Sequence, residues 1–270
     1  MTDLTNLIKG IDVSAIQGNI DWQSVAAAGY QFCVCRCGVG NGGKDSFYDR
    51  NIASATAAGL KVAAYHFVYP LPPASGQPLR DPVKQAQLHV GWAGSVPVVC
   101  CDLEWPTPQD WTKWGCSAAQ IVQWTVTYLQ AYEAASGIKP VVYTYPSFAS
   151  SIHLPADFGQ TYKLWIASYT ASPAVPAPWT DWVMWQNSGG TQHLPNGVAV
   201  DCDFAKDLSL WNAAPAPVVT TPDPTPPPTP DPPPVPLPVP APTPVVPVSS
   251  PSIWTTIYQT VTGLFSKLPK

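Results

Sequence analysis

Prolines are distributed very unevenly along this chain, and their position divides it. Of the 34 prolines among 270 residues, 18 lie between Pro215 and Pro251. Proline fixes φ and lacks the N–H that helices and sheets need, so residues 214–251 are expected to form an extended polyproline II linker. Residues 1–213 are numerous enough for one domain with a substantial core. A third segment, 252–270, follows the linker.

The last segment has the pattern of an amphipathic helix. Ser252 is a candidate N-cap, and Lys267 and Lys270 accompany the end of an apolar stripe. The stripe must be buried on a membrane, on a second copy of the chain or on the preceding domain, and the lysines favour an anionic membrane or a lipid-rich outer layer. Its members are Ile253, Trp254, Ile257, Tyr258, Val261, Leu264, Phe265 and Leu268.

Before the linker, short apolar runs alternate with helical patterns. Helices are expected within 46–59 and 117–137; in the second, Ser117 and Gln120 have capping-box spacing and Gly137 follows the end. The apolar runs are rich in valine, as in strands buried on both faces. Eight of them, with helices mainly in the first half, predict an α/β fold, an irregular TIM-like barrel with an incomplete helical ring. The runs are LIKGIDVS, YQFCVCRCG, LKVAAYHFVY, VPVVCCDLEW, KPVVYTYP, KLWIASY, DWVMWQ and GVAVDCDF.

The net charge and the cysteine content limit the possible partners and the compartment in which the protein is made. A formal net charge of −4 argues against nucleic acid as a partner, because phosphate binding needs a basic surface. Residues 1–15 lack the cationic start and apolar run of a signal peptide, so we expect synthesis in a cytoplasm, with the seven cysteines reduced. Cys33, Cys35 and Cys37 alternate along one strand. A thiolate metal site is one interpretation; apolar packing is favoured, because CxCxC lacks zinc-ligand spacing.

Acidic residues at the ends of the predicted strands indicate where the catalytic site lies. A TIM-like barrel gathers its catalytic groups at the C-terminal ends of its strands. Asp102 and Glu104, two residues apart at the end of the fourth predicted strand, face the same way. The eighth strand ends in Asp201 and Asp203, and in a closed barrel it neighbours the first strand, which brings Asp12 close. The sequence therefore predicts a ring of acids around one pocket.

Clustered carboxyls suit glycoside hydrolysis. One keeps its proton near neutral pH because of like-charged neighbours and protonates the leaving oxygen, while others stabilise positive charge at the anomeric carbon. Glu104 is the natural acid, because the other glutamate, Glu133, lies in the long helix. No cofactor is expected. A divalent-metal site is the alternative; it is disfavoured because the accompanying histidine, His66, alternates away from Tyr65 and Phe67.

At these residues the sequence resembles the family 25 glycoside hydrolases, the Chalaropsis-type lysozymes (N-acetylmuramidases). The matching segments occur in the family's order and with its spacing, and they span residues 8–205. The segments are GIDVSAIQGNIDW at 10–22, AAYHF at 63–67, DLEW at 102–105, VVYTYPSF at 141–148, LWIASY at 164–169, MWQNSGG at 184–190 and VDCDF at 200–204.

The resemblance implies an irregular barrel of eight strands and about five helices. It also implies cleavage of the β-1,4 bond between N-acetylmuramic acid and N-acetylglucosamine in peptidoglycan, with Glu104 as general acid. By position, the residues similar to the family's catalytic carboxylates are Glu104, Asp102, Asp12 and Asp201, and those similar to its substrate contacts are Tyr65, Tyr143 and Trp185.

The sequence departs from the family pattern at two places. Trp105 and Pro106 follow the DLE triplet where a further acid is common, and Asp203 stands where Asn is commoner. Members without a signal peptide are common as phage endolysins released to the wall by a holin, so the resemblance implies an endolysin. A catalytically silent glycan-binding or virion structural module is the alternative, and the intact acids argue against it.

Overall fold

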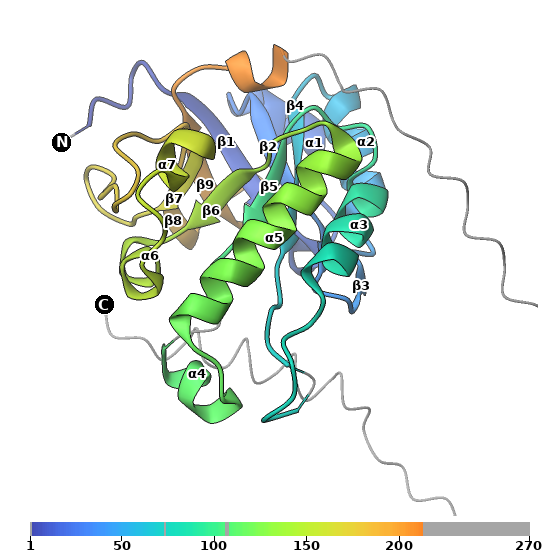
Figure 1. Cartoon of the computed structure of the whole chain (residues 1–270). Coiled ribbons are helices and arrows are strands. Elements are labelled where there is room, and N and C mark those ends of the chain that lie inside the picture. The colour runs from blue at the N-terminus through green and yellow to red at the C-terminus, as the bar shows by residue number, and fades with distance from the viewer. Residues whose placement is uncertain (1, 73, 106–107, 213–270) are drawn as a thin grey trace, which may run out of the picture. The chain divides into compact units, whose positions relative to one another are not determined.

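The computed structural model describes residues 2–72, 74–105 and 108–212. The predicted linker, 214–251, and the predicted amphipathic helix, 252–270, lie outside these residues. The strands and helices follow one another in the alternating order expected from the sequence (Figure 1). The strands are β1 (Ile8–Val13), β2 (Phe32–Val39), β3 (Gly43–Lys44), β4 (Lys61–Phe67), β5 (Val99–Asp102), β6 (Val141–Thr144), β7 (Leu164–Ala167), β8 (Met184–His193) and β9 (Ala199–Ala205). The helices are α1 (Trp22–Ala27), α2 (Tyr48–Ala57), α3 (Pro82–Ala93), α4 (Pro108–Trp114), α5 (Ala118–Ser136), α6 (Pro146–Ile152) and α7 (Phe158–Thr161), with short 3-10 turns η1 (Ala15–Gln17) and η2 (Ser209–Asn212).

Eight of the described strands close into a barrel. Hydrogen bonds run from β1 through β2, β4, β5, β6, β7 and β8 to β9, which pairs back on β1, while β3 is added outside β2. The predicted α/β barrel is therefore confirmed, and each of the eight predicted apolar runs overlaps one barrel strand, although β8 continues seven residues beyond its run, to His193.

The last strand departs from the expected direction. The barrel strands from β1 to β8 are parallel to one another, whereas β9 is antiparallel to both β8 and β1. A tight hairpin joins β8 to β9, so the start of β9, not its end, lies at the C-terminal mouth. The expectation that Asp201 and Asp203 end a strand is therefore wrong, although the reversed strand still delivers Asp201 to the mouth.

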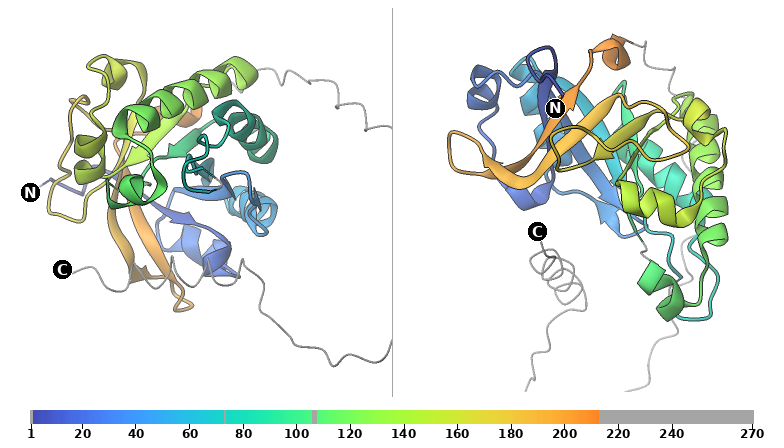
Figure 2. Two further views of the ribbon diagram at one scale, coloured as in Figure 1. Left: turned by 60° about the horizontal axis from the view of Figure 1, so that its bottom comes forward. Right: turned by 90° about the vertical axis from the view of Figure 1, so that its left-hand side faces the viewer.

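The helices cover only part of the barrel, as predicted. In the left view of Figure 2, α2, α3 and α5 lie along one side, and β8 and β9 carry no helix among the described residues. Helix α5 begins where its sequence indicated: Ser117 and Gln120 form a reciprocal capping box, and Gly137 ends the helix with φ 70°. None of the described helices is long and apolar enough to cross a bilayer.

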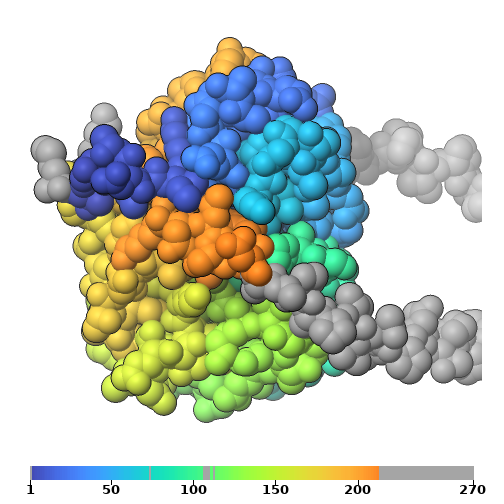
Figure 3. Space-filling view, turned by 90° about the horizontal axis from the view of Figure 1, so that it is seen from above, coloured from blue at the N-terminus to red at the C-terminus, as the bar shows by residue number. Residues whose placement is uncertain are grey.

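Two apolar layers build the core. The outer layer lies between the strands and the helices, and it contains the buried side chains of Cys33, Cys35 and Cys37, as the packing interpretation expected. The inner layer fills the barrel. At the end opposite the mouth, the segment that contains η2 lies at the surface (orange, Figure 3), and Trp211 packs on Phe32 with ring centroids 5.1 Å apart. All the cysteines lie in the described part of the chain, and none forms a disulfide there.

Candidate active site

Strand alternation turns the acids into the barrel. On β5, Cys101 packs in the outer layer, whereas Asp102 faces inward at the mouth. Leu103 points outward, so Glu104, two residues after Asp102, lies on the inner side again. On β1, Ile11 and Val13 belong to the outer layer, which leaves Asp12 inside. The sequence pattern thus predicted correctly that Asp102 and Glu104 face the same way, and barrel closure that Asp12 joins the acids at one pocket.

Register brings the acids of β1 and β9 together. Asp12 is paired with Asp201 across the antiparallel ladder, and Gly10 with Asp203. Asp203 therefore lies one step deeper in the barrel than Asp201, and it is fully buried. The indole Nε1 of Trp165 donates to Asp203 Oδ1 at 2.8 Å. The backbone N–H of Gly190, in the β8–β9 hairpin, donates to Asp201 Oδ1.

A residue that the sequence pattern did not single out connects this cluster. Gln186 follows Trp185 on β8 and faces inward. Its Nε2 donates to Asp12 Oδ2 at 2.7 Å and approaches Asp201 Oδ2 at 3.4 Å. Its Oε1 accepts from the hydroxyls of Tyr143 and Tyr169, each at 2.9 Å. The alternation in the MWQ triplet was the signal that could have found Gln186, because an outward Trp185 implies an inward glutamine.

Burial and mutual repulsion keep protons on the acids of β1 and β9. Burial, followed by the charges of Asp201 and Asp203, raises the pKa of Asp12 well above its usual range. Burial also raises the pKa of Asp203 to about 8 and raises the pKa of Asp201, whose charge the Gly190 N–H helps to stabilise. Unpaired buried charges cost several kcal/mol each, so these carboxyls share protons instead of all being ionised.

The acids of the DLE triplet behave in the same way. Burial, followed by the charge of Asp201, raises the pKa of Glu104 to about 7. Burial and the neighbouring Glu104 raise the pKa of Asp102 well above its usual range, and Arg36 partly opposes this. Arg36 itself pairs with the buried Asp45 at 2.8 Å, so much of its charge is already compensated. Glu104 thus holds a proton that it can donate near neutral pH.

The aromatic side chains divide between the two layers. Tyr65 and Tyr143 face the interior, where both pack against Trp165 with ring centroids 6.2 and 4.6 Å away. Trp185 faces the opposite way: it is 1 % exposed, packs in the outer layer and donates from Nε1 to Ser168 O at 2.7 Å. The structure therefore brings Tyr65 and Tyr143 to the acids but not Trp185, and the implied substrate contact of Trp185 lacks geometric support.

Other aromatic groups lie at the rim. Tyr169, two residues after the end of β7, is 61 % exposed although its hydroxyl reaches Gln186. Next to Glu104, the half-buried ring of Trp105 packs on Tyr69 with centroids 4.4 Å apart. Exposed aromatic faces beside carboxyls are typical of carbohydrate sites, because sugar C–H groups pack on them.

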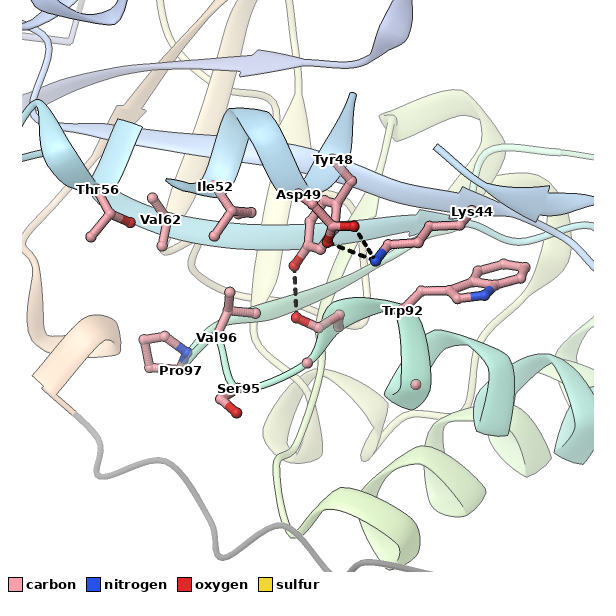
Figure 4. Close-up of a pocket in the computed structure, with 13 residues that line it drawn as sticks. Lys44, Tyr48, Asp49, Ile52, Thr56, Val62, Trp92, Ser95, Val96 and Pro97 are labelled. Atoms are coloured by element: carbon pink, nitrogen blue, oxygen red, sulfur yellow. Dashed lines mark hydrogen bonds and ion pairs between the residues drawn. The ribbon is translucent and has the colours of Figure 1, made fainter. Parts of the chain in front are cut away.

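A groove of about 430 Å³ opens elsewhere, between α2 and the segment after α3 (Figure 4). Lys44 and Asp49 form an ion pair at 2.6 Å on its wall, and the Tyr48 hydroxyl donates to Ala93 O at 2.7 Å. Asp49 is the one acidic side chain among its described lining residues, and its charge is paired. The groove therefore lacks the carboxyl set needed for acid catalysis, which the barrel mouth supplies.

Comparison with known proteins agrees with this arrangement. The family model "Glycosyl hydrolases family 25" matches residues 11–194. Lysozyme M1 of Streptomyces globisporus is 31 % identical over 208 residues, covering 75 % of this chain and 68 % of that protein. The N,O-diacetylmuramidase of a Chalaropsis species is 28 % identical over 209 residues, covering 70 % and 94 %. The crystal structure of a lysozyme from Streptomyces coelicolor is similar with a TM-score of 0.66 and 26 % identity, covering 76 % and 97 %.

Proposed function

The chain belongs to the glycosyl hydrolases of family 25, a membership that supports peptidoglycan hydrolysis, and we propose that it is a muramidase. Its substrate is the glycan strand of peptidoglycan, and the bond cut is the β-1,4 linkage from N-acetylmuramic acid to N-acetylglucosamine. The similarity to a lysozyme and an N,O-diacetylmuramidase supports this substrate.

The observation that carries the proposal is the convergence of separate acids at one mouth of the barrel. Glu104 and Asp102 come from the end of β5, Asp12 from β1 and Asp201 from β9. Glu104 donates its proton to the glycosidic oxygen as the bond to the anomeric carbon breaks. In this reactive form the proton of the pair resides on Glu104, and the ionised Asp102 beside it stabilises the positive charge that develops at that carbon. Water then adds its hydroxyl to the carbon and returns a proton to Glu104.

Clearing of purified sacculi tests this proposal. Peptidoglycan stripped of protein and accessory polymer is incubated with the full-length protein, and turbidity and soluble glycan fragments are followed together. Falling turbidity with release of fragments is expected. The alternative, a silent glycan-binding or virion structural module, predicts that the protein sediments with sacculi without clearing them, and the intact carboxyl cluster does not favour it.

We extend the proposal to host lysis and to the C-terminal segment. Expressed in a bacterial cytoplasm, the protein is expected to lyse cells only when a holin is co-expressed. Residues 252–270 are proposed to bind anionic lipid through the apolar stripe. Flotation with anionic vesicles and size-exclusion chromatography, comparing the full chain with one truncated after Ala213, test the second part. Loss of vesicle binding on truncation supports it; an oligomer that ignores vesicles contradicts it.

A further inference from the structure

The amide of Gln186 is surrounded by four polar partners from four parts of the barrel. Asp12 lies on β1, Asp201 on β9, Tyr143 on β6, and Tyr169 follows β7. Gln186 is only 3 % exposed, so water does not compete freely for these hydrogen bonds. No other described side chain touches both the β1–β9 acid pair and the tyrosines in the hydrogen bonds of this site.

The partners determine which way the amide points. Buried carboxylates accept hydrogen bonds and need donors, and the NH₂ group of glutamine offers two. The tyrosine hydroxyls donate to Oε1 from the other side. A flipped amide would aim Oε1 at Asp12 and Asp201 and leave both acids without this donor, at a cost typical of unsatisfied buried groups, about 1–3 kcal/mol or more. The amide is therefore fixed in one orientation.

Tyr169, the tyrosine at the rim, is contacted by the β8–β9 hairpin as well as by Gln186. Gly189 approaches Tyr169 so closely that a Cβ at Gly189 would lie 2.7 Å from the hydroxyl oxygen. The next residue, Gly190, donates its N–H to Asp201. The β8–β9 hairpin and Gln186 thus support Tyr169 and Asp201 together, so the position of the exposed ring is coupled to that of the acid.

We propose that Gln186 is a positioning residue for the muramidase reaction: its amide holds Asp12 and Asp201 in place against their repulsion and connects them to Tyr143 and the exposed Tyr169. This inference rests on the proposed function. An amide suits the task because it does not titrate, so it donates to the acids whatever their protonation. A glutamate of equal size would bring a further negative charge and lose the donor once ionised.

The variant Gln186→Glu tests this role through pH. The titratable groups facing position 186 are Asp12, Asp201, Asp203, Tyr143 and Tyr169. At low pH the new carboxyl is protonated, can donate to Asp12 and accept from the tyrosines, and is expected to retain much of the activity. Burial and the neighbouring acids raise its pKa, so it ionises only as the pH rises through that higher value, and the rate is then expected to fall by roughly 10–100-fold, the range found for residues that orient metal ligands through hydrogen bonds. The wild-type to variant rate ratio should therefore rise with pH.

A matched control adds the same charge to the same strand. Gln192 lies further along β8 with an exposed side chain, so Gln192→Glu is expected to keep the wild-type pH profile. Circular dichroism and thermal unfolding establish that each variant is folded. A folded Gln186→Glu protein that is as fast as the wild type, or that is slower by the same factor at every pH, would overturn the inference.

A second variant applies if Gln186→Glu does not fold. Tyr169→Phe removes only the hydroxyl that donates to Gln186 and leaves an exposed ring, so the fold is expected to persist. A several-fold lower rate with unchanged KM is expected; an unchanged rate contradicts the inference. Failure of the proposed function is distinguishable in the same assay, because the wild-type protein would then release no glycan fragments at any pH.

Discussion

Asp12 on β1 and Asp201 on β9 lie directly opposite each other across an antiparallel strand pair. The two carboxyls share one donor, Gln186 Nε2, at 2.7 and 3.4 Å. Like charges this close in a buried site cannot both be fully ionised, so at least one proton is retained between them. One member of the pair also acts on the catalytic acid: burial is the main cause of the raised pKa of Glu104, and the charge of Asp201 adds to it.

Removing the proton donor should abolish most of the activity. Glu104→Gln keeps the size of the side chain but cannot protonate the leaving oxygen, so the rate on sacculi is expected to fall by roughly 10²–10⁴. Glu133→Gln is the matched control: Glu133 is on α5, 40 % exposed, and its pairing with Lys139 at 3.5 Å is worth little. Near-normal activity of Glu104→Gln would assign the acid to another residue.

The rate should fall as pH rises through the pKa of the acid. Glu104 acts only when protonated, and its pKa is raised to about 7, so the descending limb of the pH–rate profile is expected near pH 7. In Asp201→Asn one cause of that raised pKa is gone, and the limb should move to lower pH. The control Asp181→Asn, an exposed residue paired with Lys206, should not move it. A limb that stays in place in Asp201→Asn would contradict this electrostatic coupling.

Asp203 should make the protein less stable as pH rises. Its native pKa of about 8 lies above the ordinary 3.8, so between these values the folded state binds more protons than the unfolded state and stability falls with increasing pH. Asp203→Asn removes this contribution and can still accept from Trp165. The gain in melting temperature over wild type is expected to widen from pH 4 to pH 8, as measured by calorimetry. A gain that is constant with pH would show that Asp203 does not titrate there.

Trp185 should matter for stability and not for substrate binding. Trp185→Phe removes the hydrogen bond to Ser168 O and leaves a gap in the outer layer, which together cost about 2–4 kcal/mol. Thermal unfolding should shift to lower temperature, while KM for a soluble glycan oligomer stays near the wild-type value. A clear rise in KM with normal stability would restore the substrate contact that the sequence resemblance implied.

The sequence allowed the barrel and most of its acids to be predicted. Continuous apolar runs identified all eight barrel strands, because strands covered on both faces need apolar residues throughout. Alternation within VPVVCCDLE fixed the shared facing of Asp102 and Glu104, and closure of the barrel implied that Asp12 meets Asp201. These predictions depend on local periodicity and on one topological rule, and both are visible in a single sequence.

The direction of β9 and the hydrogen-bond partners of Gln186 could not be predicted in the same way. Nothing in the local pattern of GVAVDCDF distinguishes a parallel from an antiparallel strand, so the reversal of β9 was missed. Gln186 was missed because its importance comes from partners far away in the chain, Asp12 and Tyr143 among them. Trp185 was expected to contact substrate because a matching motif carries residue identity but not the side of the strand that each residue occupies.

The chemistry of the new chain ends tests the central claim most directly. Sacculi digested with the full-length protein are reduced with borohydride, hydrolysed and analysed by mass spectrometry. A muramidase leaves N-acetylmuramic acid at the reducing end, so reduced muramic acid is predicted in the wild-type digest and not in that of Glu104→Gln. Reduced glucosamine ends would indicate a glucosaminidase, and anhydromuramic ends a lytic transglycosylase; either result would contradict muramidase activity for this chain.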